Sequence, residues 1–153
     1  MSTTGPSGWN PAVRVYRTIN QPITGSTITA LSFDAERFEQ GGGTIAPQHD
    51  PAVNPTRLTC YIDGIYVITG HIAWASAPNA NNVQVAIRLN GTTYIARDVF
   101  ALAQNVINGS LTTVAHLAVN DYVELCVYQN SGGAIDIIAA PMESPEFAMV
   151  RVG

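Results

Sequence analysis

The chain has 153 residues, a formal net charge of −4 and only 12% charged residues, and all seven of its basic side chains are arginine. The absence of lysine excludes a Schiff-base lysine and a phosphate-loop lysine, and the negative charge argues against a nucleic-acid partner. No apolar run approaches the roughly 18 residues of a membrane span, and the first residues lack the basic and apolar regions of a secretory signal, so we expect no membrane partner.

The first twelve residues are rich in Ser, Thr, Gly and Pro around a single aromatic residue, Trp9. This composition cannot form a core, so we expect residues 1–12 to be an extended N-terminal arm and residues 13–153 to be the folded domain. Trp9 can bury a large apolar area. We predict that it anchors the arm on a neighbouring subunit or on a shell beneath the protein. The alternative is that it folds back on its own domain.

Short strands follow the arm, because runs of apolar and β-branched residues are interrupted by Gly, Pro and Asn. The expected strands are residues 12–19, 26–33, 57–62, 65–75, 83–89, 93–100, 110–119, 122–129, 134–138 and 147–152. Asn90-Gly91, Asn108-Gly109 and Asn120-Asp121 are expected turns. No helical period of useful length interrupts this pattern. The sequence therefore predicts an all-β sandwich or barrel, and we favour a jelly-roll β-sandwich of about ten antiparallel strands.

The central strand that follows Asp63-Gly64 is apolar on both faces. Ile65 and Val67 point to one side and Tyr66 and Ile68 to the other, because side chains alternate along a strand. An antiparallel strand usually exposes one face to water, so two apolar faces need two covers. One cover is the core of the protein. The other is either a second sheet face or a neighbouring subunit, and the alternation does not say which face meets which cover.

Several of these segments together resemble the superfamily of complement-type globular heads and tumour necrosis factors. The resemblance covers residues 13 to 152 and rests on Ser32-Phe33-Asp34, Leu58-Thr59-Cys60, Gly64-Ile65-Tyr66 and the segments 83–91, 117–125 and 147–152. Two positions depart from the family pattern. Asn120 stands where the family has Gly, which Asn tolerates because it enters the left-handed region readily. The pair Ala148-Met149 stands where a small Gly follows the closing aromatic residue.

The resemblance implies a homotrimer, and the strand at residues 122–129 agrees with that expectation. One face of this strand carries valine and leucine, and the other carries two tyrosines and a thiol, which suit a partly buried surface. The alternative is an ordinary amphipathic strand with exposed tyrosines. We predict that the trimer interface contains Tyr66, Ile68, Tyr122, Cys126, Tyr128 and Phe147.

No catalytic or metal-ligating pattern emerges from the sequence. His49 lies in a long Pro-rich loop and is expected to be solvated, whereas His71 and His116 lie on strands and are expected to be core or interface residues. The three histidines are not paired at ligand spacing, and the carboxylates near Asp34 lack a calcium-loop pattern. We expect both cysteines, Cys60 and Cys126, to be free thiols. We therefore expect no enzyme, no catalytic residues, no metal site and no cofactor.

These observations favour a structural role in a bacteriophage particle, where a trimeric jelly roll would reach the outside by lysis. Within the virion we favour a capsid decoration or head-surface protein that coats or stabilises the shell. The alternative is a tail-fibre or tail-tip head that recognises a host surface glycan or protein, and a spore- or cell-surface protein is a third possibility. The expected partners are other copies of the chain and the capsid or tail proteins of the same particle. This hypothesis rests on fold and context rather than on a site.

Overall fold

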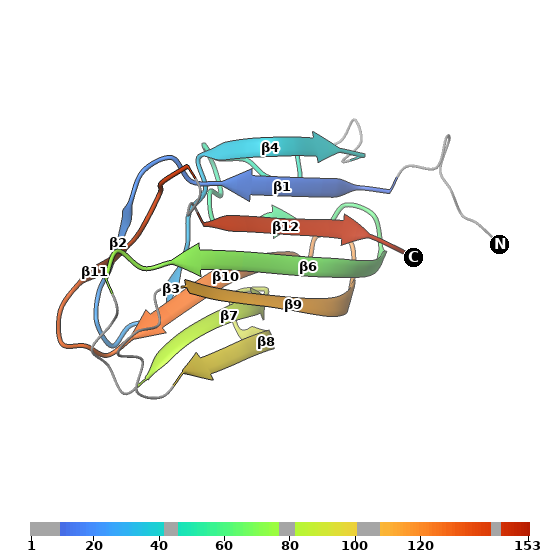
Figure 1. Cartoon of the computed structure of the whole chain (residues 1–153). Helices are drawn as coiled ribbons and strands as arrows, with labels where there is room; N and C mark the ends of the chain where they lie inside the picture. The colour runs from blue at the N-terminus through green and yellow to red at the C-terminus, as the bar shows by residue number, and fades with distance from the viewer. Residues whose placement is uncertain (1–9, 42–45, 77–81, 101–107, 142–144) are drawn as a thin grey trace.

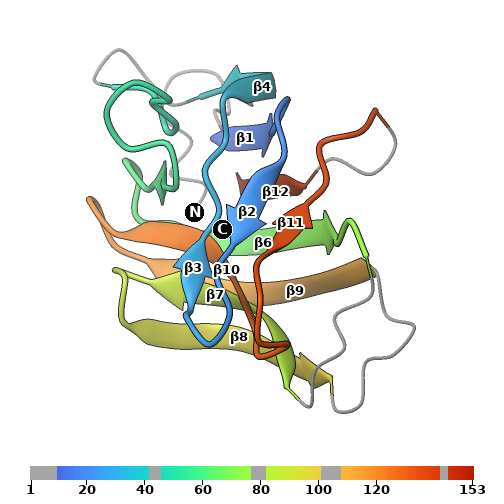
Figure 2. The same ribbon diagram turned by 90° about the vertical axis from the view of Figure 1, so that its left-hand side faces the viewer.

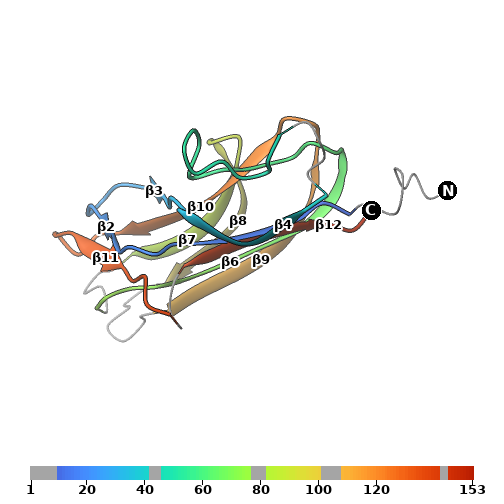
Figure 3. The same ribbon diagram turned by 90° about the horizontal axis from the view of Figure 1, so that it is seen from above.

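The computed structural model describes residues 10–41, 46–76, 82–100, 108–141 and 145–153, and these residues fold into antiparallel β-sheets. Two larger sheets are packed face to face, as the view from above shows (Figure 3). Among the described residues, no helix is long and apolar enough to cross a membrane. The all-β expectation is confirmed.

The strands have the following bounds: β1 Ala12–Tyr16, β2 Gln21–Ile23, β3 Thr29–Ala30, β4 Ala35–Gln40, β5 Leu58–Thr59, β6 Gly64–Ala73, β7 Val83–Leu89, β8 Thr93–Phe100, β9 Asn108–Leu117, β10 Tyr122–Gln129, β11 Ile135–Ile137 and β12 Glu146–Arg151. Sheet I has the order β4-β1-β12-β6-β9 and lies in front in Figure 1. Sheet II has the order β3-β10-β7-β8, with β5 also paired to β10. The short pair β11-β2 lies at one end of the sandwich (Figure 2).

Neighbouring strands within a sheet are mostly distant in sequence, which is the connectivity of a jelly roll. The central segment of the chain illustrates this. Leu58–Thr59 pairs with β10 in sheet II, whereas Gly64 begins β6 in sheet I, so the chain crosses between the sheets at Asp63-Gly64. A Cβ atom at Gly64 would lie 2.3 Å from the carbonyl oxygen of Gly153. Glycine is required there because the C-terminal backbone passes so close to this crossing.

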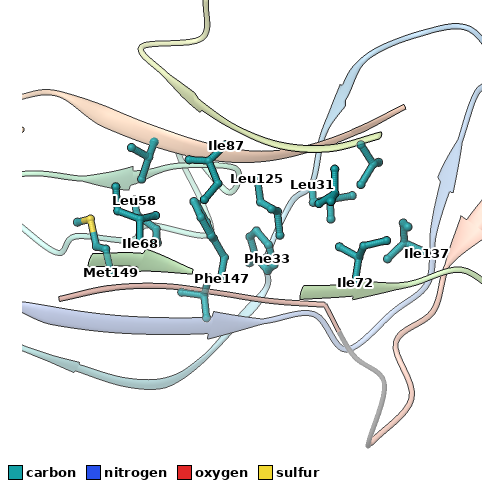
Figure 4. Packing of buried hydrophobic residues seen from close by; sticks show 14 of the residues in the cluster. Leu31, Phe33, Leu58, Ile68, Ile72, Ile87, Leu125, Ile137, Phe147 and Met149 are labelled. Atoms are coloured by element: carbon teal, nitrogen blue, oxygen red, sulfur yellow. The ribbon is translucent and has the colours of Figure 1, made fainter. Parts of the chain in front are cut away.

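The core lies between the two sheets and is formed by the inward side chains of both (Figure 4). Phe33 and Phe147 stack with their ring centroids 6.0 Å apart. Leu125 of sheet II packs against Gly70 of sheet I, where an added Cβ would lie 2.7 Å from the Leu125 side chain. The two sheets therefore approach each other closely at Gly70. Cys60 and Cys126 are both buried free thiols, as the sequence predicted.

Two of the predicted turns are confirmed by their backbone angles. Asn90 and Gly91 have φ values of 52° and 75°, and Asn120 has a φ of 74°, so asparagine does adopt the left-handed conformation where the related family has glycine. The turn predicted at Asn108-Gly109 is wrong. Both residues belong to β9 and pair with Ala73 and Ile72 of β6, and a Cβ atom added at Gly109 would lie 3.5 Å from the Ile72 side chain.

Sequence periodicity missed two strands and overestimated a third. β2 has three residues with a proline at its centre, and β4 is dominated by charged residues, so neither shows an apolar alternation. The strand predicted at residues 26–33 forms a ladder only at Thr29–Ala30. The reason is that strand pairing depends on a neighbouring strand supplied by the fold, which local composition does not contain.

Candidate oligomer interface

The outward face of sheet I, on the side away from sheet II, is organised in rows across the strands. The β-ladders place Val114, Val67, Val150, Ala12 and Gln40 side by side in one row. The next row contains Thr112, Thr69, Ala148, Arg14 and Phe38. A third row contains Ser110, His71, Glu146, Tyr16 and Ala35. The face therefore changes from apolar to charged along the strands, and we call the first of these rows the valine row.

The apolar part of this face is accessible in the single chain. Val114 is 62% exposed, Phe38 49% and Val150 37%, and Ile65 next to the valine row is 38% exposed. A shallow hollow of about 540 Å³ lies over β1, β12 and β6 and is lined mainly by apolar side chains of these rows. Exposed apolar side chains gathered on one face make it a candidate site for contact with another protein surface.

At the charged end of the same face, one carboxylate pairs with two arginines. Glu146 accepts hydrogen bonds from Arg37, 2.8 Å away, and from Arg14, and the Arg37 guanidinium lies 3.8 Å from the centre of the Tyr16 ring. Burial alone would raise the pKa of Glu146, but the two arginines outweigh it and hold the pKa below its ordinary value. The carboxylate is therefore ionised near neutral pH and fixes the two arginines on the face.

The structure does not bring the six predicted interface residues together. Tyr66, Ile68 and Phe147 are fully buried in the core between the sheets, and the Tyr66 hydroxyl donates a hydrogen bond to the Ile62 carbonyl oxygen at 2.8 Å. Burial, followed by interaction with Cys60, raises the pKa of Tyr66 above its ordinary value. A side chain with no exposed surface in one chain has none to offer to a second chain. These three residues therefore stabilise the protomer.

The remaining three predicted residues lie on the opposite side of the molecule, on the outer side of sheet II. Cys126 is fully buried there, with its sulfur 3.2 Å from Nε of Arg88. Tyr122 is half-buried beneath Arg57, whose guanidinium lies 3.9 Å from the ring centre, and Tyr128 is also half-buried. The half-buried position of Tyr122 is therefore explained by a contact within the chain.

The sequence did identify the two faces of β6, and the structure shows that the face of Tyr66 and Ile68, predicted to lie at the interface, is the one buried in the core. Alternation shows that Tyr66 and Ile68 share a face, and that Ile65 and Val67 share the other, but it does not show which face is inward. Gly70 is the residue from which the inward face of β6 could have been predicted. It lies on the face of Tyr66 and Ile68, and a glycine on a strand marks the side at which another backbone or side chain approaches closely.

The histidines lie in three different environments, and the prediction for His49 is wrong. His49 is buried rather than solvated, with Nδ1 3.1 Å from Oε1 of Glu36 and Nε2 3.3 Å from the Pro55 carbonyl oxygen. His71 is exposed on the outward face of sheet I, and His116 is exposed with Nε2 3.2 Å from Oδ1 of Asp63. Within the described part of the chain, no three His, Cys, Asp or Glu side chains are grouped to hold a metal ion.

The predicted arm lies mostly outside the described residues, and so does its anchor Trp9. Pro11 and Ala12, at the end of the predicted arm, are buried, and the Pro11 carbonyl oxygen accepts a hydrogen bond from the Arg151 backbone at 2.9 Å. Ala12 is already the first residue of β1. The junction between arm and domain is therefore fixed against the C-terminal strand.

Comparison with solved structures identifies the fold. Murine APRIL at pH 5.0 aligns over 94% of this chain and 99% of its own, with a TM-score of 0.63 and 10% identity. PRD1 vertex protein P5 aligns over 94% and 97%, with a TM-score of 0.62 and 13% identity. Eiger TNF from S. frugiperda aligns over 94% and 92%, with a TM-score of 0.60 and 9% identity. The chain thus has the tumour necrosis factor-like jelly-roll fold. Comparisons with protein families and with curated protein sequences found no match.

Proposed function

We propose that this chain is a non-enzymatic structural protein of a bacteriophage particle, which assembles as a homotrimer and coats the shell as a capsid decoration protein. The observation that carries the proposal is the exposed valine row on the outward face of sheet I. Three valines there, Val114, Val67 and Val150, lie side by side on three adjacent strands, and within the described chain Val114 is 62% exposed, Val150 is 37% exposed and Val67 is half-buried. In the proposed trimer, a second and a third copy of the chain cover these valines.

The energetics favour association through this face over exposure to water. Full burial of a valine, isoleucine or phenylalanine side chain is worth about 1.5–3 kcal/mol. Val114, Phe38, Ile65 and Val150 each expose between 37% and 62% of their surface, so each copy has several kcal/mol of hydrophobic free energy to gain. The two arginines beside this apolar surface share Glu146 as an acidic partner, so the Glu146 carboxylate itself is not left unpaired when the neighbouring apolar surface is buried.

The step from a trimer to a virus particle has separate support. One of the similar structures is a vertex protein, so this fold occurs in a component of that kind. The low charged fraction leaves a neutral surface suited to lateral contacts within a shell. In the proposal, the arm with Trp9 attaches the trimer to the capsid protein beneath it, which gives the protein a second contact independent of the sheet face.

Two measurements test the proposal at its two levels. Light scattering on the purified protein at micromolar concentration is expected to give the mass of three chains, and a stable monomer would remove the basis for the trimer. Cryo-electron microscopy of the particle is expected to place the trimer on the head. Density for the protein at the tail alone would instead support the receptor-binding alternative.

A further inference from the structure

The outer face of sheet II, on the side away from sheet I, gathers arginine and tyrosine side chains. The β-ladders place Glu124 of β10, Arg88 of β7 and Tyr94 of β8 side by side in one row. Arg97 of β8 lies on the same face, because it pairs with Ala86, and alternation directs Ala86 and Arg88 to the same side of β7. Side chains of three adjacent strands are therefore brought together on one surface.

Two arginines on this face are stacked on tyrosine rings. The Arg57 guanidinium lies 3.9 Å from the centre of the Tyr122 ring, and Tyr122 shares the outer side of β10 with Glu124. The Arg97 guanidinium lies 5.5 Å from the centre of the Tyr94 ring. A guanidinium stacked on a ring keeps its N–H groups available in its own plane, so it is prepared to pair with a carboxylate.

The three arginines of this face, Arg57, Arg88 and Arg97, lack an acidic partner within the described residues. None of them forms an ion pair there, in contrast to the two arginines that share Glu146. Nε of Arg88 lies 3.2 Å from the Cys126 sulfur. The guanidinium groups of Arg57 and Arg97 make no hydrogen bond within the same part of the chain. Most of the N–H groups of these arginines are therefore left to water or to a partner.

The ladders of β10, β7 and β8 place one carboxylate on this face, and the chain itself uses it. Glu124 is buried and accepts a hydrogen bond from the Thr56 hydroxyl. It lies opposite Arg88 and offsets part of the charge of that arginine. Asp121, which precedes β10, accepts a hydrogen bond from the Asn90 side chain at 2.9 Å. The face therefore keeps an excess of positive charge, although the whole chain has a net charge of −4.

We propose that the outer face of sheet II is a docking surface for an acidic segment of another protein. Arginine and tyrosine are enriched in protein interfaces, above all among the residues that contribute most to binding. The two stacks lie over β10 and over β8, which are two strand spacings or about 10 Å apart. One small anion cannot contact both stacks, whereas a segment with several carboxylates can. The charge of such a segment is complementary to that of the face.

This surface is separate from the proposed trimer interface. The valine row lies on the outward face of sheet I, and the two sheets are packed face to face, so the arginines of sheet II lie on the opposite side of the sandwich (Figure 3). One chain can therefore use both surfaces at once. Binding of an acidic segment does not depend on the trimer.

The proposal is tested by fluorescence anisotropy of a labelled oligoglutamate peptide of about eight residues, roughly 26 Å long when extended, with the full chain. An oligoglutamine peptide of the same length is the neutral comparison. Oligoglutamate is expected to bind saturably at low salt and to lose most of its binding at about 0.15 M salt, where the screening length is about 8 Å. Oligoglutamine is expected not to bind.

Arg97→Gln should weaken oligoglutamate binding about two- to fivefold, because it removes one exposed ion pair. Arg88→Gln combined with Arg97→Gln should weaken it about tenfold. The matched control is Arg151→Gln on β12 of sheet I, where the arginine also forms no ion pair within the described residues and donates a hydrogen bond to the Asp63 carbonyl oxygen at 3.0 Å. It changes the net charge as Arg97→Gln does and should leave binding unchanged.

Equal binding of the two peptides would overturn the proposal, as would equal weakening by Arg97→Gln and Arg151→Gln. Tighter binding of a single-stranded DNA of similar length would overturn the assignment to an acidic protein segment. Salt-sensitive growth of the protein beyond the trimer, abolished by Arg97→Gln, would also overturn it and assign the face to a second copy of this chain. Circular dichroism should confirm that the variants fold. Light scattering on the same samples reports the trimer independently, so a failure of peptide binding is distinguishable from a failure of the assembly.

Discussion

Replacement of Val114 by aspartate is the sharpest test of the proposed interface. Val114 is at the end of the valine row and is 62% exposed in the single chain. Covering that exposed fraction is worth about 1–2 kcal/mol per copy, given about 1.5–3 kcal/mol for complete burial of a valine. Three copies lose about 3–6 kcal/mol per trimer when the side chain is replaced. This loss alone corresponds to at least about two decades in the trimer dissociation constant.

The introduced carboxylate adds to that loss, because each buried ion costs several kcal/mol of desolvation. Three carboxylates on one symmetric interface also repel one another. We therefore expect Val114→Asp to be a folded monomer at micromolar concentrations at which the unsubstituted protein is a trimer. Light scattering coupled to size-exclusion chromatography, repeated over a dilution series, measures this shift.

The matched control is Val99→Asp. Val99 is 46% exposed on β8, which is the edge strand of sheet II, so the substitution has the same chemistry and a similar strand position but lies away from the outward face of sheet I. It should remain trimeric. Trimers of Val114→Asp that persist to the same dilution as the unsubstituted protein would refute the reasoning, and so would equal dissociation of the control.

Gly70→Ala is expected to lower the free energy of unfolding by about 1–3 kcal/mol in denaturant titrations, because the new methyl group meets Leu125 at the closest approach of the two sheets; an unchanged midpoint would show that this contact relaxes freely. Burial raises the pKa of Cys126 to about 11, so the folded state retains a proton that the unfolded state releases near pH 9, and stability is expected to fall by up to about 3 kcal/mol as pH rises through this window. Cys126→Ala should reduce the decline of stability with pH in unfolding curves measured at several pH values. The same decline in the variant would show that the Cys126 thiol does not cause it. Deletion of residues 2–9 should leave the melting temperature nearly unchanged while weakening attachment to the particle, and full attachment of the truncated protein in a pull-down with purified capsids would exclude the arm as the anchor.

The sequence determined the fold class and most of the strands. β7, β8 and β10 have the predicted bounds, because each shows a clear alternation and is flanked by turn residues. The left-handed turns at Asn90 and Asn120 were also readable, since few residues tolerate positive φ. These features depend on local conformational preferences, which are determined by residues close together in the sequence.

The tertiary structure decided which apolar face is covered within the chain. Val67 and Ile68 are adjacent in the sequence and equally apolar, yet one lies on the open valine row and the other is fully buried. Leu125 of the other sheet packs against Gly70, so the face of β6 that carries Gly70, Tyr66 and Ile68 lies inward. Burial of His49 against Glu36 was decided in the same way. Alternation fixes which side chains share a face, but only the packing of distant segments fixes what each face contacts, because that contact is made by residues far away in the chain.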